Sequence, residues 1–155
     1  MTFDAKVLTV SDSVSRGSRE DLSGAALAGV LADRGFTVVE RRVVTDGVLP
    51  VSTALTELSA GFVGLLASTG GTGFAPTDLT PEATRSVLER HAPGLSESMR
   101  AASPLGGLSR GVAGTIGQCL VINLPGSPRG AVESIEAVMG ILGHALELLA
   151  GHQPH

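Results

Sequence analysis

Few of the residue types that mark secreted, membrane-bound or nucleic-acid-binding proteins occur in this sequence of 155 residues. Its single cysteine, Cys119, excludes a disulfide within the chain and fits a reducing compartment. No apolar run approaches the ~18 residues that a membrane-spanning helix needs, and the first residues do not resemble a secretory signal. We therefore expect a cytoplasmic globular protein with no membrane contact.

The balance of charge argues against nucleic acid as a partner. The chain carries 11 basic and 15 acidic residues, for a net charge of −4, and its longest basic run is Arg41-Arg42. Nucleic-acid affinity depends mainly on clustered lysines and arginines that neutralise phosphates, and single-strand binding adds stacked aromatic rings. With four phenylalanines, no tryptophan and no tyrosine, the sequence lacks both features.

Glycine is the residue type in excess. The 21 glycines make up about 14% of the chain, against an average of about 7%. They concentrate at the ends of apolar runs, where a missing Cβ permits tight turns and lets the backbone approach a ligand closely. This distribution indicates ligand-binding turns rather than a flexible linker.

Apolar and β-branched runs alternate with helical patterns along the chain. The runs predict strands over residues 5–10, 36–44, 62–67, 108–115 and 119–124. Helical spacing and capping signals predict helices over residues 24–34, 50–60, 80–91, 95–102 and 128–150. Residues 13–23 are expected to form a loop, and residues 151–155 a disordered tail. This alternation predicts one α/β domain over residues 1–150, with a mostly parallel sheet covered on both faces.

Polar or glycine-rich segments follow three of the expected strands: Ser11-Asp12, residues 69–78 and residues 123–127. The carboxyl ends of parallel strands share one edge of the sheet, and in open α/β sheets ligands bind outside that edge. We therefore expect the three segments to converge there. Each segment by itself is equally consistent with a turn of purely structural function.

The central segment, Ser-Thr-Gly-Gly-Thr-Gly over residues 68–73, invites comparison with phosphate-binding loops. A Walker loop needs Gly-Lys-Ser or Gly-Lys-Thr, and the only lysine of the chain is Lys6. A dinucleotide-binding loop needs glycine or alanine three residues after Gly73, where Pro76 stands. The remaining hypothesis is a loop whose backbone amides surround an anion without a lysine, with phosphate or a phosphate-like group as the ligand.

Two acidic residues stand beside these segments. Asp46 follows the strand over 36–44, and Asp78 ends the glycine-rich segment before the helix over 80–91. Carboxylates beside an anion-binding loop suit Mg²⁺, which takes one or two carboxylates together with substrate phosphates. An Asp-Gly turn for Asp46 and an acid at a helix start for Asp78 are the alternative interpretations.

Several stretches of the sequence together resemble one known family. The stretches are residues 9–12, 15–17, 20–24, 69–84, 108–110, 113–115 and 123–128. In this order and spacing they resemble the molybdenum-cofactor biosynthesis domain of the MogA/MoaB type, also found as the gephyrin G domain. The resemblance spans nearly the whole chain.

The resemblance implies a three-layer αβα sandwich and a molybdopterin adenylyltransferase. Such an enzyme transfers AMP from ATP to the phosphate of molybdopterin with Mg²⁺ and releases pyrophosphate. Asp46 and Asp78 would be the catalytic acids and would hold the Mg²⁺. The residues expected to line the nucleotide and pterin site are Ser11, Asp12, Thr69, Gly70, Gly71, Thr72, Gly73, Ser109, Arg110, Asn123, Pro125, Gly126 and Ser127.

The resemblance also implies a homo-oligomer, either a trimer or a hexamer, and a partner enzyme that inserts molybdenum. A charged fraction of 17% and an apolar last helix suit a subunit interface. Ser13 and Ile116 depart from the family, because many members carry arginine at these positions. The loss of two cations keeps one alternative open, a molybdopterin-binding homologue or scaffold without catalysis. The glycine-rich loop by itself would also permit a second alternative, an unrelated nucleotide-binding module.

Overall fold

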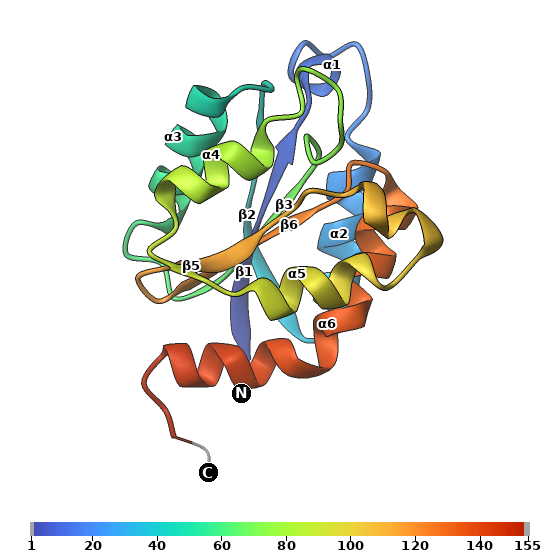
Figure 1. The fold of residues 1–155 in the computed structure, drawn as a ribbon. Helices are drawn as coiled ribbons and strands as arrows, with labels where there is room; N and C mark the ends of the chain where they lie inside the picture. The colour runs from blue at the N-terminus through green and yellow to red at the C-terminus, as the bar shows by residue number, and fades with distance from the viewer. Residues whose placement is uncertain (1, 154–155) are drawn as a thin grey trace.

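The fold is built on a six-stranded sheet, seen in a computed structural model that describes residues 2–153 (Figure 1). The strands lie in the order β2-β1-β3-β6-β5-β4. Their bounds are β1 Phe3–Val10, β2 Phe36–Val44, β3 Gly64–Thr69, β4 Arg90–His91, β5 Ala113–Ile116 and β6 Cys119–Leu124. β1, β2, β3 and β6 run parallel, whereas β5 is antiparallel to β6, and β4 to β5. The prediction of a mostly parallel sheet is confirmed.

Helices cover both faces of this sheet, which gives three layers (Figure 1). They are α1 Asp12–Ser15, α2 Leu22–Asp33, α3 Val48–Ser59, α4 Thr80–Val87, α5 Pro93–Arg100, the 3-10 helix η1 Pro104–Leu108 and α6 Pro128–Leu149. On one face, α2, α5 and α6 bury Leu31, Met99 and Ile135 in an apolar cluster. On the other face, α3 and α4 bury Leu55 and Ala83 in a second cluster. The predicted αβα sandwich is therefore confirmed.

The continuous apolar run of β3 follows from its central place in the sheet. Leu65 belongs to the cluster of α2, α5 and α6, and Leu66 belongs to the cluster of α3 and α4. Both side chains are fully buried, because a parallel strand with helices on both faces has no side that meets solvent. β1 and β6 flank β3, so the carboxyl ends of these three strands meet at one edge of the sheet.

Three of the predicted elements differ from the structure in type or by more than two residues at one end. The loop predicted over 13–23 contains part of α1, a single turn in which Ser11 Oγ accepts a hydrogen bond from the Val14 amide at 3.3 Å. The helix predicted over 80–91 ends at Val87. The strand predicted over 108–115 begins at Ala113, after η1 and a short extended stretch.

Pairing with a distant segment explains the early end of α4. The Glu89 amide donates to the Thr115 carbonyl at 2.9 Å, and the Ala92 amide donates to the Ala113 carbonyl at 2.8 Å. These bonds hold the two-residue strand β4 against β5. A two-residue strand leaves no periodicity in the sequence. The local pattern therefore predicted a helix through residue 91, although the pairing of β4 with β5 ends α4 at Val87.

Two further expectations concern the end of the chain and membranes. Residues 151–153 of the predicted disordered tail form an exposed turn after α6, and residues 154–155 lie outside the described residues. Between residues 2 and 153, no helix combines the length and the apolar character needed to cross a membrane.

The only lysine of the chain lies inside the sheet. Lys6 is in β1, between β2 and β3, and its side chain is 16% exposed. Its ammonium group donates to the Leu58 carbonyl at 2.9 Å, lies 3.6 Å from a Glu40 oxygen and stands 4.3 Å from the centre of the Phe62 ring. Lys6 is therefore held within the fold and is not available to a ligand at the carboxyl edge.

Candidate active site

The segments after β1, β3 and β6 meet at the carboxyl edge of the sheet, as predicted. The Ser11 amide donates to the Val44 carbonyl at 3.0 Å, which joins the ends of β1 and β2. The Gly70 amide donates to the Leu124 carbonyl at 3.1 Å, which joins the ends of β3 and β6. Backbone pairing therefore fixes these segments side by side.

Two glycines allow the backbones of the three segments to touch. Gly70 has a φ of +104°, and a Cβ there would lie 2.2 Å from the Val10 carbonyl oxygen. A Cβ on Gly126 would lie 3.2 Å from the Gly70 Cα. The first contact excludes any side chain at residue 70, because no Cβ can approach a backbone oxygen so closely. The segments thus form a continuous floor of backbone at this edge.

A cavity of about 250 Å³ lies on this floor, and we call it the acid pocket. The residues of the predicted set that line it are Ser11, Asp46, Thr69, Gly70, Gly71, Asp78 and Gly126. Asp46 follows β2 and Asp78 follows β3, so the fold brings two carboxylates that are distant in the sequence into one cavity.

The glycine-rich segment presents unpaired backbone donors next to these acids. The amides of Gly71, Thr72 and Gly73 donate to no backbone carbonyl within residues 2–153. Gly71 has a φ of +68°, and a Cβ there would lie 2.3 Å from Thr80 Oγ1, so only glycine fits. Successive amides without partners are the donor set with which a glycine turn binds an anion.

Asp46 and Asp12 hold each other through their backbones. The Asp46 amide donates to Asp12 Oδ1 at 2.9 Å, and the Asp12 amide donates to Asp46 Oδ2 at 3.2 Å. Burial raises the pKa of Asp46; the hydrogen bond from Asp12 opposes this rise, and the negative charges of Asp12 and Asp78 add to it. A cation beside Asp46 would favour its ionised form. Asp12 therefore borders the acid pocket through Asp46 rather than lining it.

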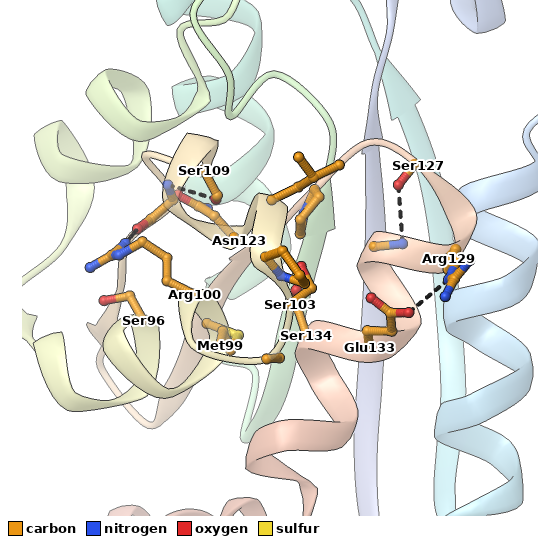
Figure 2. Close-up of a pocket in the computed structure, with 17 residues that line it drawn as sticks. Ser96, Met99, Arg100, Ser103, Ser109, Asn123, Ser127, Arg129, Glu133 and Ser134 are labelled. Atoms are coloured by element: carbon orange, nitrogen blue, oxygen red, sulfur yellow. Dashed lines mark hydrogen bonds and ion pairs between the residues drawn. The ribbon is translucent and has the colours of Figure 1, made fainter.

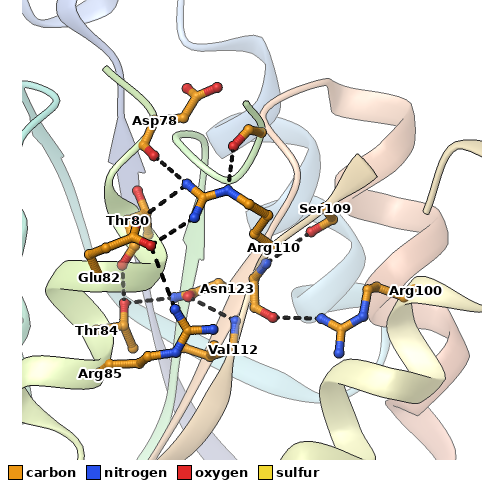
Figure 3. A network of polar contacts seen from close by, with 12 residues as sticks. Asp78, Thr80, Glu82, Thr84, Arg85, Arg100, Ser109, Arg110, Val112 and Asn123 are labelled. Carbon is orange, nitrogen blue, oxygen red and sulfur yellow. Dashed lines mark hydrogen bonds and ion pairs between the residues drawn. The ribbon is translucent and has the colours of Figure 1, made fainter. Parts of the chain in front are cut away.

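Asp78 ends a loop that Arg110 clasps (Figure 3). Arg110 Nε donates to the Gly73 carbonyl at 2.7 Å, and Nη2 donates to the Asp78 carbonyl at 2.6 Å, so one guanidinium joins both ends of the loop. Nη1 donates to Glu82 Oε2 at 2.7 Å, and this hydrogen bond lowers the pKa of Glu82. The Asp78 carboxylate accepts a hydrogen bond from the Ala75 amide at 3.0 Å. These contacts fix where the carboxylate stands.

The geometry of Arg110 differs from the predicted contact with substrate. The residue lines no cavity that we describe at this edge, and its guanidinium is directed to the loop and to Glu82. Its amide also donates to the Thr72 carbonyl at 2.8 Å, so Thr72 is held from the same side. Arg110 therefore holds the loop that carries Asp78, and Thr72 and Gly73, which were predicted to line the site, line neither cavity.

The side chain of Asn123 also makes its hydrogen bonds within the protein. Its Nδ2 donates to Ser68 Oγ and to Thr84 Oγ1, both at 3.0 Å, and its Oδ1 accepts from the Val112 amide at 3.1 Å (Figure 3). The residue is 2% exposed. These bonds tie β6 to β3, to α4 and to the segment before β5, so the side chain fixes the elements that carry the acid pocket.

A second cavity, of about 460 Å³, lies between α5, η1 and α6, and we call it the wide cavity (Figure 2). The predicted residues that line it are Ser109, Asn123, Pro125 and Ser127. Residues that the sequence did not point to complete the wall, among them Met99, Arg100 and Leu105. They belong to α5 and η1, a region in which the sequence carries no recognisable motif.

The turn over residues 125–128 separates the two cavities. Pro125 and Ser127 line the wide cavity, whereas Gly126 and Pro128 line the acid pocket. Thr69 Oγ1 donates to the Pro125 carbonyl at 2.6 Å, which holds the turn on the end of β3. A ligand lying across Gly126 would therefore reach into both cavities.

Arg19 is the cation of the acid pocket that sequence reasoning missed. It is the only lysine or arginine lining that pocket among the residues that the structure describes. The feature of the sequence that could have indicated Arg19 is its position in the segment between the first strand and the helix that follows. That segment starts at the same carboxyl edge as the predicted ligand-binding segments.

The donor set of the acid pocket fits a magnesium ion that binds together with a phosphate ligand. Within residues 2–153, no three His, Cys, Asp or Glu side chains gather into a ready-made metal site. The predicted acids Asp46 and Asp78 nevertheless line the same pocket, together with Glu20, and Mg²⁺ commonly binds through one or two carboxylates, substrate phosphates and water. The raised pKa of Asp46 gives an electrostatic reason for a cation there.

The chain is similar over most of its length to proteins of known name. Residues 6–144 match the family described as "Probable molybdopterin binding domain". The molybdopterin adenylyltransferase of Helicobacter pylori (strain J99) is 37% identical over 158 residues, covering 97% of this chain and 90% of that protein. The molybdopterin adenylyltransferase of Escherichia coli K12 is 35% identical over 152 residues, covering 94% of this chain and 78% of that protein.

A solved structure leads to the same family. The molybdopterin biosynthesis enzyme MoaB from Thermus thermophilus superposes with a TM-score of 0.91 at 46% identity. The superposition covers 96% of this chain and 97% of that one. The resemblance inferred from the sequence motifs is confirmed. The chain therefore belongs to the molybdenum-cofactor biosynthesis family, whose shared unit is the probable molybdopterin-binding domain.

Proposed function

We propose that this protein is a molybdopterin adenylyltransferase, which transfers AMP from ATP to the phosphate of molybdopterin. The observation that carries the proposal is the meeting of Asp46 and Asp78 in one pocket, above a glycine floor with unpaired amides. Relatives in Helicobacter pylori and Escherichia coli bear the name of this activity.

The reaction asks for positioning and charge stabilisation rather than for acid–base chemistry. A phosphate oxygen of molybdopterin forms a bond to the α-phosphorus of ATP. The bond from that phosphorus to the oxygen bridging to the β-phosphate breaks, and its electron pair leaves with pyrophosphate. The ionised substrates already carry all the negative charge of the products, so no side chain has to remove a proton. Catalysis of this type depends on orientation and on electrostatic stabilisation.

The acid pocket must therefore overcome repulsion between anions. Two unit charges ~4 Å apart repel by roughly 1 kcal/mol in water and about 4 kcal/mol at an effective dielectric constant of 20. Asp46 and Asp78 by themselves would add to this repulsion. Asp46 and Asp78 would hold Mg²⁺, and its positive charge would offset the repulsion. The amides of Gly71, Thr72 and Gly73, which donate to no described backbone carbonyl, supply donors for the phosphate oxygens.

The wide cavity is the place for the pterin. Met99 and Leu105 offer apolar contact there, and Ser109 and Ser127 offer hydroxyl groups. Neighbouring residues of the turn over 125–128 line the two cavities, and Gly126 of this turn carries no side chain. Molybdopterin lying across Gly126 brings its phosphate into the acid pocket.

Pyrophosphate release tests the activity. Incubation of the protein with molybdopterin, Mg²⁺ and ATP should release pyrophosphate, and no release above background would contradict the proposal. Asp46→Asn and Asp78→Asn should each lower turnover by about 100-fold or more, since each removes a charge that holds the cation. Their melting temperatures should stay near that of the wild type, because asparagine keeps an oxygen that can accept the existing hydrogen bonds. Wild-type rates in both variants would make the aspartates turn and cap residues.

A molybdopterin-binding scaffold without catalysis is the second candidate, and Ser13 is the observation that favours it. Ser13 Oγ lies 3.2 Å from Ser11 Oγ at the border of the acid pocket, where many family members place an arginine. Ile116, the other departure, packs against the cluster of α3 and α4 and lines neither cavity. Calorimetry that detects tight molybdopterin binding without ATP consumption would select this candidate.

Assembly is a separate part of the proposal. We expect a homo-oligomer, a trimer or a hexamer, because α6 exposes Ile141 and Leu148, which are 53% and 45% accessible in the single chain. Light scattering at micromolar concentration measures the mass, and a monomer would contradict the expectation.

A further inference from the structure

Only two basic side chains make no polar contact with the described part of the chain. Of the 11 lysines and arginines, seven pair with carboxylates. Arg90 donates to Thr115 Oγ1 and Arg100 donates to the Gly111 carbonyl. The remaining two, Arg16 and Arg19, have neither an ion pair nor a side-chain hydrogen bond within residues 2–153. Acidic residues outnumber basic ones in this protein, so the absence of a carboxylate partner for both arginines is unusual.

Both arginines lie in the segment that joins α1 to α2, and this segment has a defined shape. The Arg16 amide donates to the Asp12 carbonyl, and the Ser18 amide donates to the Ser13 carbonyl, both at 3.0 Å. Ser18 Oγ donates to the same carbonyl at 3.1 Å. Gly17, with a φ of +76°, makes the turn between the two arginines. Hydrogen bonds therefore fix the backbone path of this segment, and Arg19 on it lines the acid pocket.

Arg19 reaches the acid pocket itself. The pocket also contains Asp46, Asp78 and Glu20, yet no carboxylate pairs with the guanidinium of Arg19. An unpaired guanidinium next to unpaired amides is available to an incoming anion with several oxygens. The carboxylates and the arginine thus serve different parts of a ligand: the carboxylates hold a cation, and the arginine contacts anionic oxygens directly.

The sheet order places Arg19 across the acid pocket from the wide cavity. β1 and β6 flank β3 on opposite sides, so the segment after β1 and the turn after β6 border the pocket from opposite sides. In the proposed reaction molybdopterin arrives over the turn after β6. The entering and leaving oxygens of a phosphoryl-type transfer lie roughly in line with the phosphorus between them. The leaving group therefore points toward the segment after β1.

We infer that Arg19, assisted by Arg16 of the same segment, binds the β- and γ-phosphates of ATP and holds them as pyrophosphate when they leave. This inference rests on the proposed adenylyl transfer and assigns the end of the pocket that receives the leaving group. Negative charge grows on the bridging oxygen as its bond to the α-phosphorus breaks, and a guanidinium beside it stabilises that charge.

Calorimetry with Mg²⁺-ATP, AMP and Mg²⁺-pyrophosphate, each without molybdopterin, tests the inference. Arg19→Gln should weaken binding of ATP and pyrophosphate about tenfold, because one exposed charge-assisted contact is lost, and should leave AMP binding unchanged. Arg16→Gln should give a smaller loss of the same kind. Arg90→Gln is the matched control, since it removes the same charge from the edge strand β4, and it should change none of the three affinities.

The outcomes separate this inference from the proposed function. Equal losses of ATP and AMP affinity in Arg19→Gln would overturn the inference, since they would mean that the arginine acts on the nucleoside part or on the shape of the pocket. Unchanged ATP and pyrophosphate affinity in Arg19→Gln, with wild-type pyrophosphate release, would overturn the inference and leave the proposed function standing. A wild-type protein that binds neither ATP nor AMP would overturn both.

Discussion

The acid pocket and the wide cavity lie on two sides of one turn, but they are built from different material. The floor of the acid pocket is backbone from the ends of β1, β3 and β6, held in contact by Gly70 and Gly126. The wall of the wide cavity is made of side chains from α5, η1 and α6, including Met99 and Leu105. Paired strand ends form the floor of the first cavity, whereas side chains from helices form much of the wall of the second.

The difference suggests a division between chemistry and recognition. A group-transfer step needs donors and carboxylates at fixed separations, which paired strand ends provide at no conformational cost when ligand binds. Recognition of a particular organic group needs surfaces that can vary in size and polarity, and side chains provide these. Substitutions in the two regions should therefore have different effects on stability and on activity.

The largest difference should appear between two glycines. Gly70→Ala puts a methyl group against the Val10 carbonyl and forces alanine to a φ of +104°, so unfolding free energy should fall by about 3 kcal/mol. Gly107→Ala, on η1 beside the wide cavity, has nothing within 4 Å of the new Cβ and should change stability by less than about 0.5 kcal/mol. Urea unfolding measures the unfolding free energy of each variant. Equal losses in the two variants would contradict the difference that we draw between the floor of the acid pocket and the region around the wide cavity.

The next effect concerns the clasp that holds Asp78. Arg110→Gln removes the donors to the Gly73 and Asp78 carbonyls and should lower turnover about tenfold while raising the Mg²⁺ concentration needed for half-maximal rate. Arg85→Gln is the control, because Arg85 lies 3.6 Å from Glu82 but has no bond to the loop. Kinetics across a magnesium titration separate the two variants. An equal magnesium dependence in Arg110→Gln and the wild type would show that the clasp does not position Asp78.

A smaller effect is expected on the side of the wide cavity. Leu105 is 74% exposed, so Leu105→Ala should leave unfolding free energy within about 0.5 kcal/mol. Loss of apolar contact should raise the KM for molybdopterin by a few-fold and leave the KM for ATP unchanged. Steady-state kinetics with each substrate varied in turn measure this. A change in the KM for ATP alone would contradict the assignment of the two cavities.

The smallest effect is a pH dependence of the ion pair between Arg110 and Glu82. Arg110 lowers the pKa of Glu82, so the pairing stabilises the fold above the ordinary carboxyl pKa of 4.5 and is lost as the pH falls through the lowered value. The contribution should be less than about 1 kcal/mol, because the Glu82 side chain is 39% exposed and water screens the pair. The stability difference between wild type and Glu82→Gln should therefore shrink from pH 7 to pH 3. A difference that is constant with pH would rule out this linkage.

The two cavities also differ in how far they could be predicted from the sequence. The buried character of β3 and β6 indicated parallel strands, and parallel strands bring their carboxyl ends together, so the acid pocket with Asp46 and Asp78 could be located in advance. The partners of Arg110 could not, because two of them are backbone carbonyls, which every residue type carries. The helix predicted over residues 95–102 corresponds to α5, but no motif in α5 or η1 indicated that these two elements form the wall of a cavity.

The position of Lys6 has a practical consequence for measuring how this protein opens. A lysine-specific protease has a single target in the sequence, and the bond after Lys6 lies in β1 between two paired neighbours. A protease needs an extended, unpaired segment, so it can cut there only after β1 has separated from β2 and β3. The cutting rate under native conditions therefore reports separation of the central strands and is insensitive to fraying of the loops around the active site.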